Sequence, residues 1–361
     1  MSRARDETFM DEALWLAKKG AGWTAPNPMV GAVVVKSGKI IGRGYHRRAG
    51  SAHAEIEALA AAGRSARGAT LYVNLEPCAH FGRTPPCTEA IINAGIKRVV
   101  CSAIDPNPQV QGRGVIRLKQ FGISVSIGVR KEEARTPNEA FFVFHEKKRP
   151  FVALKFAMSL DGKLATKKGD SKWITGEKAR SFARNLRGRY QAILVGVNTV
   201  ICDNPHLGAR TKGKKNPMRI IVDSRLRIPL NADVLRDADV IIATTSSAPE
   251  TKIKSLEKRG IRVLTFTGTR VPIKKLLAEL RKREILSVFV EGGGEILGSF
   301  IDAEVVDRVY AFYAPIIIGG REAISISGKG SDKIIDALRF KTISVKKFRE
   351  DVLVIADRSH D

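Results

Sequence analysis

Residues 53–59 read HAEIEAL, and residues 75–87 read LEPCAHFGRTPPC. These two segments bring a histidine, a glutamate two positions after it, and two cysteines into a short part of the chain. An imidazole nitrogen and two thiolates are ligands that zinc binds well, and three protein ligands leave the fourth tetrahedral position open to water. The pattern therefore predicts a catalytic zinc site.

His53, Cys78 and Cys87 are the predicted zinc ligands. If His53 begins a helix, Glu55 points near the metal without binding it, which suits a general acid and base. Zinc deaminases use such a glutamate to carry protons while an activated water attacks an amidine-like carbon. His80 is a rival ligand, although we expect it to lie behind the ligands or to face the substrate.

The signature of zinc deaminases is H-x-E followed by P-C-x-x-C. HAE and PC are present here, but eight residues separate the two cysteines instead of two. In the alternative interpretation, His53 is an ordinary helix residue, and Cys78 and Cys87 are small buried hydrophobic residues. The order of three metal ligands and an acid favours the metal site.

Composition limits the class of protein. A chain of 361 residues favours two domains over a single core. No run of about 18 apolar residues is present, so no transmembrane helix and no membrane partner are expected. The start lacks an apolar signal core and the four cysteines make no disulfide framework, which predicts a cytoplasmic protein. The formal net charge of +25 favours anionic ligands such as phosphates, with a basic solvated surface as the alternative.

Strands alternate with helices in both halves, which predicts an α/β fold. In the first half we expect a helix at 7–19 and a hairpin at 29–46 that turns at 36–38. Further strands are expected at 69–75, 97–104 and 123–129, with helices from Ala52, after Pro86 and after Gly112. The second half begins with PFVALKFAMSLDG at 150–162 and continues through apolar strands at 191–197, 219–224, 239–245, 262–266, 287–294, 308–318 and 351–357. The charged segment HEKKRPF at 145–151 is the predicted linker, which gives domains at 1–147 and 150–361.

The first half resembles a known family in four motifs: APNPMVGAVVV, HAEIEAL, LEPCAHFGRTPPCTEAI and DPNPQVQGRG. They look like the deaminase domain of the bifunctional riboflavin-biosynthesis deaminase/reductase family. The gap that ends in GRTPPC separates this family from tRNA-adenosine, cytidine and guanine deaminases. The resemblance implies zinc on the three ligands, proton transfer by Glu55, and Asn27 near the pyrimidine. Asn27 and Pro28 could equally form a plain turn.

The second half, from about Pro150 onward, resembles the reductase domain of the same family in ALKFAMSLDGKLA, SKWITG, ILVGVNTVICDNPHL and VEGGGEILGSFI. The resemblance implies a dihydrofolate-reductase-like fold. It implies that NADPH is contacted by Ala157, Trp173, Thr199, Asp203, Ser224, Gly293, Gly294, Glu295, Ile296, Leu297, Gly298 and Ser299. It implies that the substrate is contacted by Ser171, Arg187, Leu207, Arg210 and Glu291.

The residue types fit these roles. Residues 292–294 are glycines between a strand and a helix, where backbone N–H groups can approach a phosphate. Arg187 and Arg210 can clamp a sugar phosphate, although surface salt bridges are the alternative. Lys155 and Asp203 are the polar groups expected near the reacting sugar, and the alternative for Lys155 is an exposed lysine on an edge strand.

Three further side chains are interpreted from residue type alone. Trp173 could equally be a core residue instead of a cofactor contact. Cys101 and Cys202 are expected to be packing residues.

The predicted fold is α/β, with an N-terminal cytidine-deaminase-like α/β/α domain and a C-terminal dihydrofolate-reductase-like α/β domain. The predicted function is two successive steps of riboflavin biosynthesis. Zinc-activated water first deaminates a phosphoribosylaminopyrimidine, and NADPH then reduces its ribosyl chain to ribityl. The expected partners are this small-molecule substrate and further copies of the chain in a dimer or tetramer, with no nucleic acid.

Two other functions compete with this one. A zinc-dependent deaminase of RNA bases is favoured by the sequence pI of about 10.1 and disfavoured by the second α/β domain. A non-enzymatic binding module with structural zinc is disfavoured by Glu55 beside an open coordination position.

Overall fold

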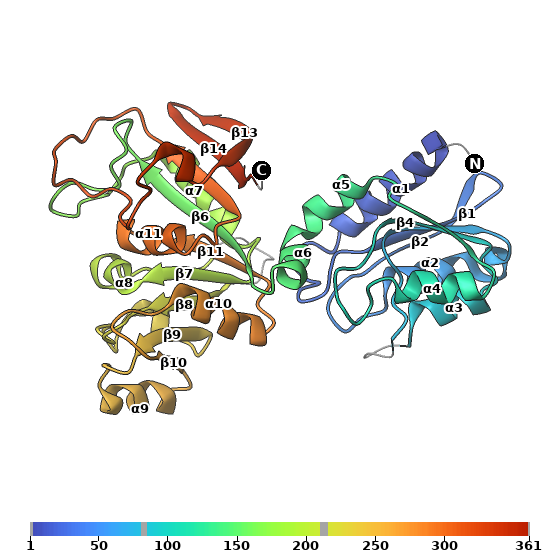
Figure 1. The fold of residues 1–361 in the computed structure, drawn as a ribbon, viewed down its shortest axis with the longest axis horizontal. Coiled ribbons are helices and arrows are strands. Elements are labelled where there is room, and N and C mark those ends of the chain that lie inside the picture. Colours follow the sequence, from blue (N-terminus) through green and yellow to red (C-terminus); the bar gives the residue numbers. More distant parts are fainter. Residues whose placement is uncertain (1–2, 81–84, 210–215, 360–361) are drawn as a thin grey trace. The chain divides into compact units, whose positions relative to one another are not determined.

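The structure, a computed structural model, describes residues 3–80, 85–209 and 216–359. The chain divides into two compact units, Met1–Arg149 and Pro150–Asp361 (Figure 1). The predicted linker at 145–151 contains this boundary. Its first two residues are not linker, however, because they end the helix α6 (Glu139–Glu146), which the sequence interpretation missed.

The N-terminal unit is built on one five-stranded sheet within the described residues, in the order β2-β1-β3-β4-β5. Its strands are β1 (Gly31–Lys36), β2 (Lys39–Tyr45), β3 (Thr70–Leu75), β4 (Arg98–Ala103) and β5 (Ser124–Ile127). Its helices are α1 (Arg3–Lys18), α2 (Ala54–Ala62), α3 (Cys87–Asn93), α4 (Arg113–Gln120), α5 (Lys131–Arg135) and α6. β1 is antiparallel to β2 and β3, and β3, β4 and β5 are parallel.

Side chains alternate between the two faces of these strands, which explains why helices pack on both faces of the sheet. In β1, Val33 and Val35 face one side, where they pack with Met10 and Leu14 of α1 and with Tyr72. The alternate residues of β1 and β3 face the other side, where they pack against α2, α3 and α4. The predicted α/β/α arrangement is therefore confirmed (Figure 1).

The hairpin between β1 and β2 turns where the sequence predicted. Ser37 and Gly38 have φ values of 50° and 78°, which a two-residue turn between antiparallel strands requires. β2 then approaches α2 closely because Gly42 and Gly44 have no side chains. A Cβ on Gly44 would lie 2.2 Å from the carbonyl oxygen of Ala54. These glycines therefore set the depth at which α2 rests on the sheet.

The C-terminal unit contains a nine-stranded sheet among the described residues, in the order β10-β9-β8-β7-β11-β6-β12-β14-β13. Its strands are β6 (Phe151–Met158), β7 (Ala192–Gly196), β8 (Met218–Val222), β9 (Val240–Thr245), β10 (Arg262–Phe266), β11 (Ser287–Glu291), β12 (Arg308–Tyr313), β13 (Phe340–Phe348) and β14 (Asp351–Arg358). Its helices are α7 (Glu177–Arg187), α8 (Val197–Asp203), α9 (Glu250–Lys258), α10 (Ile273–Lys282) and α11 (Gly294–Asp302). The strands from β10 to β12 in this order are parallel, and β14 and β13 complete the sheet with antiparallel pairs.

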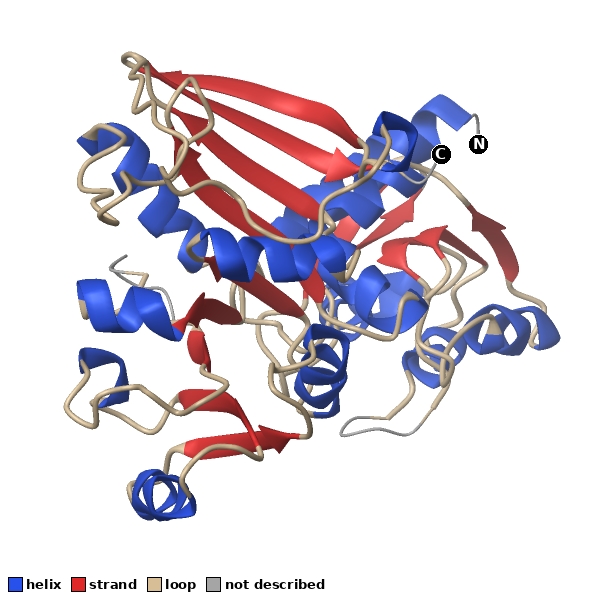
Figure 2. Cartoon of the chain, turned by 60° about the vertical axis from the view of Figure 1, so that its left-hand side comes forward, coloured by secondary structure: helices blue, strands red, loops and turns tan. Residues whose placement is uncertain are grey.

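Helices cover both faces of the parallel part (Figure 2). One core holds Leu154 and Leu194 of the sheet with Leu276 of α10 and Phe300 of α11. The other holds residues of β7, β8 and β9 with α8 and α9. Burial on both faces explains the short continuous apolar runs in the sequence. β13 was not predicted from sequence, because it lies at the sheet edge and shows no buried face.

Replacement of Gly44 by alanine tests the close packing of β2 on α2. The added Cβ meets helix backbone, so α2 must move, and the N-terminal unit should lose about 1–3 kcal/mol of stability. Hydrogen–deuterium exchange of the whole protein should become faster in peptides from β2 and α2 and stay unchanged after residue 150. Ser124→Ala, on the exposed side of β5, is the control. Unchanged exchange in α2 would contradict this packing argument.

Candidate active sites

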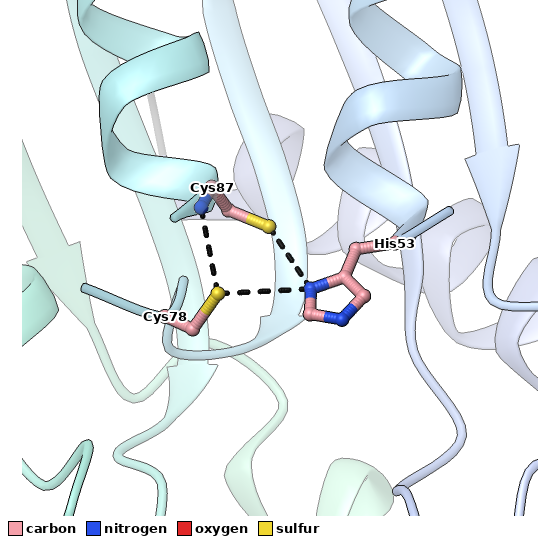
Figure 3. Close-up of side chains that lie close together, drawn as sticks. All are labelled: His53, Cys78 and Cys87. Carbon is pink, nitrogen blue, oxygen red and sulfur yellow. Dashed lines mark hydrogen bonds between the residues drawn. The ribbon is translucent and has the colours of Figure 1, made fainter. Parts of the chain in front are cut away.

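Three side chains from three separate elements meet in the N-terminal unit (Figure 3). His53 is the N-cap of α2, Cys78 follows the end of β3, and Cys87 is the first residue of α3. The Nδ1 atom of His53 lies 3.1 Å from Sγ of Cys87 and 3.6 Å from Sγ of Cys78. The three candidate ligand atoms all lie within 4.8 Å of one another, which is close enough to hold one ion.

Local backbone structure brings the two sulfurs together across eight intervening residues. Pro77 has no N–H group and follows closely after the last residue of β3. The backbone N–H of Cys87 donates to Sγ of Cys78 at 3.4 Å, and the N–H of Thr88 donates to the carbonyl oxygen of Cys78 at 3.2 Å. The start of α3 thus holds Cys78, and a helix start also favours a thiolate over a thiol.

The three side chains of the cluster shift one another's pKa values. A hydrogen bond from Cys87 lowers the pKa of Cys78, although burial opposes the shift. The same hydrogen bond raises the pKa of Cys87, as does its burial. A hydrogen bond with Cys78 raises the pKa of His53. Two sulfurs and one imidazole nitrogen form a donor set that fits zinc, which binds thiolates and neutral imidazole.

Glu55 lies in the first turn of α2 with only 4% of its surface exposed. Burial, together with the charge of Cys78, raises the pKa of Glu55 to about 7. Its carboxyl group is hydrogen-bonded to Cys87 and does not belong to the three-residue cluster. A carboxyl group beside the ligands, with a pKa near neutrality, can both accept and donate a proton.

His46 is a buried neighbour of the cluster that the sequence interpretation missed. Its Nε2 lies 3.1 Å from Nδ2 of Asn27, and its Nδ1 lies 3.1 Å from the carbonyl oxygen of Ala52. Its ring packs edge-on against His53 at 5.5 Å between centroids. Burial lowers the pKa of His46. Because the Asn27 amide nitrogen can only donate and the Ala52 carbonyl oxygen can only accept, Nε2 of His46 accepts and Nδ1 donates, which is a neutral tautomer. A single histidine at the end of β2 carries no motif, and so gave no signal in the sequence.

The sequence left the roles of Asn27 and His80 undecided. The backbone of Asn27 does form a turn, with its N–H donating to the carbonyl oxygen of Thr24, while its side chain is directed to His46. His80 lies outside the three-residue cluster. Its Nδ1 is buried and has no hydrogen-bond partner among the described residues. A substrate-facing role for either residue stays a prediction.

In the C-terminal unit, Arg187 and Glu291 form a partly buried bidentate ion pair. Nε and Nη2 of Arg187 each lie 2.8 Å from a carboxylate oxygen of Glu291. Lys155 is paired in register with Glu291 across β6 and β11. Burial lowers the pKa of Lys155, while the Glu291 carboxylate opposes that shift. Lys155 is therefore on an interior strand of the sheet and not on an edge.

Several other predicted residues follow the C-terminal ends of parallel strands. Thr199 and Asp203 lie in α8, directly after β7, and Ser224 lies just after β8. Asp203 pairs with Lys172 at 3.0 Å, and Ser224 Oγ accepts the backbone N–H of Val271 at 3.2 Å. Ligands of parallel α/β sheets bind at this edge.

The remaining predicted contacts differ in exposure. Trp173 is 70% exposed and stacks with the Arg180 guanidinium at 4.3 Å, so it is not a core residue. Leu207 is buried, whereas Ala157 and Ser171 are accessible. Arg210 lies outside the described residues.

The glycine-rich turn combines an open position with close packing. Gly293 is the N-cap of α11, and a Cβ there would meet nothing within 4 Å. A Cβ on Gly294 would lie 1.9 Å from the carbonyl oxygen of Ser325, and one on Gly298 would lie 1.8 Å from that of Ser327. Space for a ligand therefore exists at Gly293, while Gly294 and Gly298 are required by the chain's own packing. The contacts of residues 293–299 with NADPH stay a prediction.

Two assignments outside these sites have opposite outcomes. Cys101 is buried, as predicted. The prediction for Cys202 is wrong, because this residue is exposed on α8.

A cavity of about 520 Å³ lies between α11, β12 and β14, and none of the predicted site residues that the structure describes lines it.

Comparisons with known proteins agree with this geometry. The family model described as "Cytidine and deoxycytidylate deaminase zinc-binding region" matches residues 3–103, and "RibD C-terminal domain" matches residues 150–354. Together with the His/Cys/Cys cluster, these matches define a zinc-dependent deaminase joined to a reductase.

Relatives match along almost the whole chain. The riboflavin biosynthesis protein RibD of Aquifex aeolicus is 48% identical over 99% of this chain and 100% of that protein. A solved structure of Acinetobacter baumannii RibD is 37% identical, with a TM-score of 0.90 over 99% of both chains. The structure of a Thermotoga maritima diaminohydroxyphosphoribosylaminopyrimidine deaminase/5-amino-6-(5-phosphoribosylamino)uracil reductase is 39% identical, with a TM-score of 0.84 over 99% of both chains. The chain belongs to the RibD family of riboflavin-biosynthesis deaminase/reductases.

Membership of this family confirms a bifunctional enzyme with zinc in the deaminase domain and NADPH as the reductase cofactor. It also confirms the cytidine-deaminase-like and reductase folds of the two units. Among the described residues, no helix is both long and apolar enough to span a membrane.

Metal analysis tests the three-residue cluster. Cys78→Ser or Cys87→Ser removes one of two thiolates, so each variant should lose most of the single zinc ion expected per chain. Cys101→Ser is the matched control, because this buried thiol lies in β4 and outside the cluster, and it should keep the metal. Full zinc content in both cluster variants would remove the assignment.

Proposed function

We propose that the protein catalyses the two reactions for which its Thermotoga maritima relative is named. The first is hydrolytic deamination of a diaminohydroxyphosphoribosylaminopyrimidine. The second is reduction of the resulting 5-amino-6-(5-phosphoribosylamino)uracil, in which ribosyl becomes ribityl. The observation that carries this proposal is the His53, Cys78 and Cys87 cluster with buried Glu55 beside it, in a chain whose second unit matches a reductase.

In the deaminase site, His53, Cys78 and Cys87 would hold zinc, which would act as the Lewis acid that activates water. Glu55 takes a proton from the attacking water and delivers protons to the ring nitrogen and to the leaving ammonia. Its burial supports this role, because a pKa of about 7 lets the group exchange protons near neutral pH. Asn27, oriented by its hydrogen bond with His46, contacts the pyrimidine.

In the reductase site, NADPH supplies the hydride and the protein supplies position and charge. Lys155 and Asp203 lie near the reacting carbon of the sugar, where one of them provides the proton that accompanies the hydride. Arg187, Glu291, Ser171, Leu207 and Arg210 contact the substrate. Nε and Nη2 of the Arg187 guanidinium already donate to Glu291. The N–H groups that remain can donate to an anionic substrate.

We also propose that the protein forms a cytoplasmic homo-oligomer, a dimer or tetramer. The edge strand β13 supports assembly, because Ile343 and Val345 on it are 50% and 63% exposed. Ile334 and Ile335 nearby in sequence are also exposed. The four cysteines are free, which fits a reducing compartment.

Glu55→Gln should separate the two activities. The amide keeps the size of the side chain but cannot carry protons, so ammonia release should fall by about 10²–10⁴-fold. Reduction of the already deaminated pyrimidine should stay near normal, because that site lies in the other unit. Glu57→Gln is the matched control, since Glu57 is on the same helix and pairs at 3.0 Å with exposed Arg47. Loss of both activities in a folded, zinc-loaded Glu55→Gln protein would refute separate sites.

Asp203→Asn should have the reverse effect. The amide cannot exchange a proton and loses the charge that pairs with Lys172, so NADPH oxidation should fall by about 10²-fold while ammonia release persists. Asp233→Asn, which breaks the partly exposed pair with Arg236, should leave both rates unchanged. Normal NADPH oxidation in Asp203→Asn would remove this residue from the reductase site.

A further inference from the structure

The geometry points to Glu76 as a positioning residue of the deaminase site: its carboxylate fixes the zinc ligand Cys78 against the first turn of α4. The inference rests on the proposed deaminase role of the cluster and adds a residue that does not bind the metal. Glu76 follows β3 directly and precedes Cys78 by two positions. Its side chain is 3% exposed, so its charge must be met inside the protein.

Three backbone N–H groups meet that charge. Oε2 of Glu76 accepts from the N–H of Gly112 at 2.9 Å and from the N–H of Asp105 at 3.2 Å. Oε1 accepts from the N–H of Val115 at 3.1 Å. The backbone N–H of Glu76 itself donates to the carbonyl oxygen of Ala103 at 2.9 Å. One carboxylate thus links the end of β3 to the segment after β4 and to the start of α4.

The carboxylate replaces a missing helix cap. The N-cap of α4 is Gly112, which has no side chain to accept the unpaired N–H groups of the first turn. Glu76 accepts two of these N–H groups, from Gly112 and Val115, and its negative charge lies at the positive end of the helix dipole. The first turn of α4 is therefore held by a residue from a neighbouring strand.

In this arrangement α4 lies in close contact with the Pro77–Cys78 peptide, which precedes the zinc ligand. A Cβ on Gly114 would lie 2.0 Å from the carbonyl oxygen of Pro77 and 3.2 Å from Oε1 of Glu76. The Pro77–Cys78 peptide is therefore in close contact with α4 on one side. On the other, the N–H groups of Cys87 and Thr88 hold Cys78. Loss of the Glu76 carboxylate would remove its three hydrogen bonds, so the first turn of α4 would hold the Pro77–Cys78 peptide less firmly.

Asp6, a second buried carboxylate of the same unit, is the control. It separates an effect on the position of the metal ligands from a general loss of stability. Asp6 is 5% exposed and accepts hydrogen bonds from Tyr72 at 2.7 Å and from Arg98 at 2.9 and 2.8 Å. It packs on the face of the sheet that α1 covers, whereas α2 and α3 cover the other face. Asp6→Asn should therefore destabilise the unit without changing the geometry of the metal ligands.

The test uses the full-length protein with Co²⁺ in place of zinc, because the visible spectrum of Co²⁺ reports its ligand geometry. Glu76→Gln keeps the size of the side chain but turns an N–H donor toward backbone donors. It should change the sulfur-to-cobalt and d–d bands and speed metal loss to a chelator by about 10–100-fold. Asp6→Asn should keep the spectrum and the rate of metal loss of the original protein while its N-terminal unit unfolds more easily.

The outcomes distinguish the proposed function from the positioning role of Glu76. An original protein that binds neither Co²⁺ nor zinc would overturn the proposed function. Normal metal binding, with the same spectrum and chelator rate in Glu76→Gln, would overturn the positioning role alone. If Glu76→Gln does not fold, Gly114→Ala answers the question, since its Cβ meets both the Pro77 carbonyl and Oε1 of Glu76 and so moves α4 away from the Pro77–Cys78 peptide. A shifted Co²⁺ spectrum in Gly114→Ala supports the inference, and an unchanged spectrum overturns it.

Discussion

The deaminase half depends on one constraint: two sulfurs and one imidazole nitrogen, from three elements, must meet within the reach of a single cation. His53 begins α2, Cys87 begins α3, and Cys78 follows β3, so both helix starts and the strand end are fixed together. The neighbouring Cys87 thiol and the His53 imidazole both lower the pKa of the half-buried Cys78. A bound metal would tie α2, α3 and the end of β3 to one point.

The surrounding helices and sheets position the ionisable side chains that do not bind the metal. Burial of Glu55 gives it a pKa near neutrality, and the glycines of β2 let α2, which carries it, rest directly on the sheet. In the other unit, interior strands place Lys155 and Glu291 side by side, and Arg187 completes a charged group. Each unit thus has its own ionisable groups: buried Glu55 in one, and the partly buried Arg187–Glu291 pair with Lys155 in the other.

The sequence predicted features that a motif marks. HAE and the two cysteines follow the order of ligands in a zinc motif, although His53 and Cys87 are 34 positions apart, and Ser37–Gly38 mark the hairpin turn. Features that no motif marks were missed. His46 reaches the cluster only through the fold, and Gly294 is required by Ser325, about thirty positions away. β13 showed no pattern because its Ile343 and Val345 face outward. Cys202 was misplaced because residue type alone does not show which side of α8 is exposed.

The central claim is that three protein ligands hold one zinc ion and leave one position for water. X-ray absorption spectroscopy of the zinc-loaded protein tests it most directly, because sulfur and nitrogen or oxygen ligands differ in distance and scattering. The account predicts two sulfurs at about 2.3 Å and two nitrogen or oxygen neighbours at about 2.0–2.1 Å, of which only one fits as imidazole. A second imidazole, as His80 or His46 would give, or a third sulfur, would show a closed structural site and contradict the account.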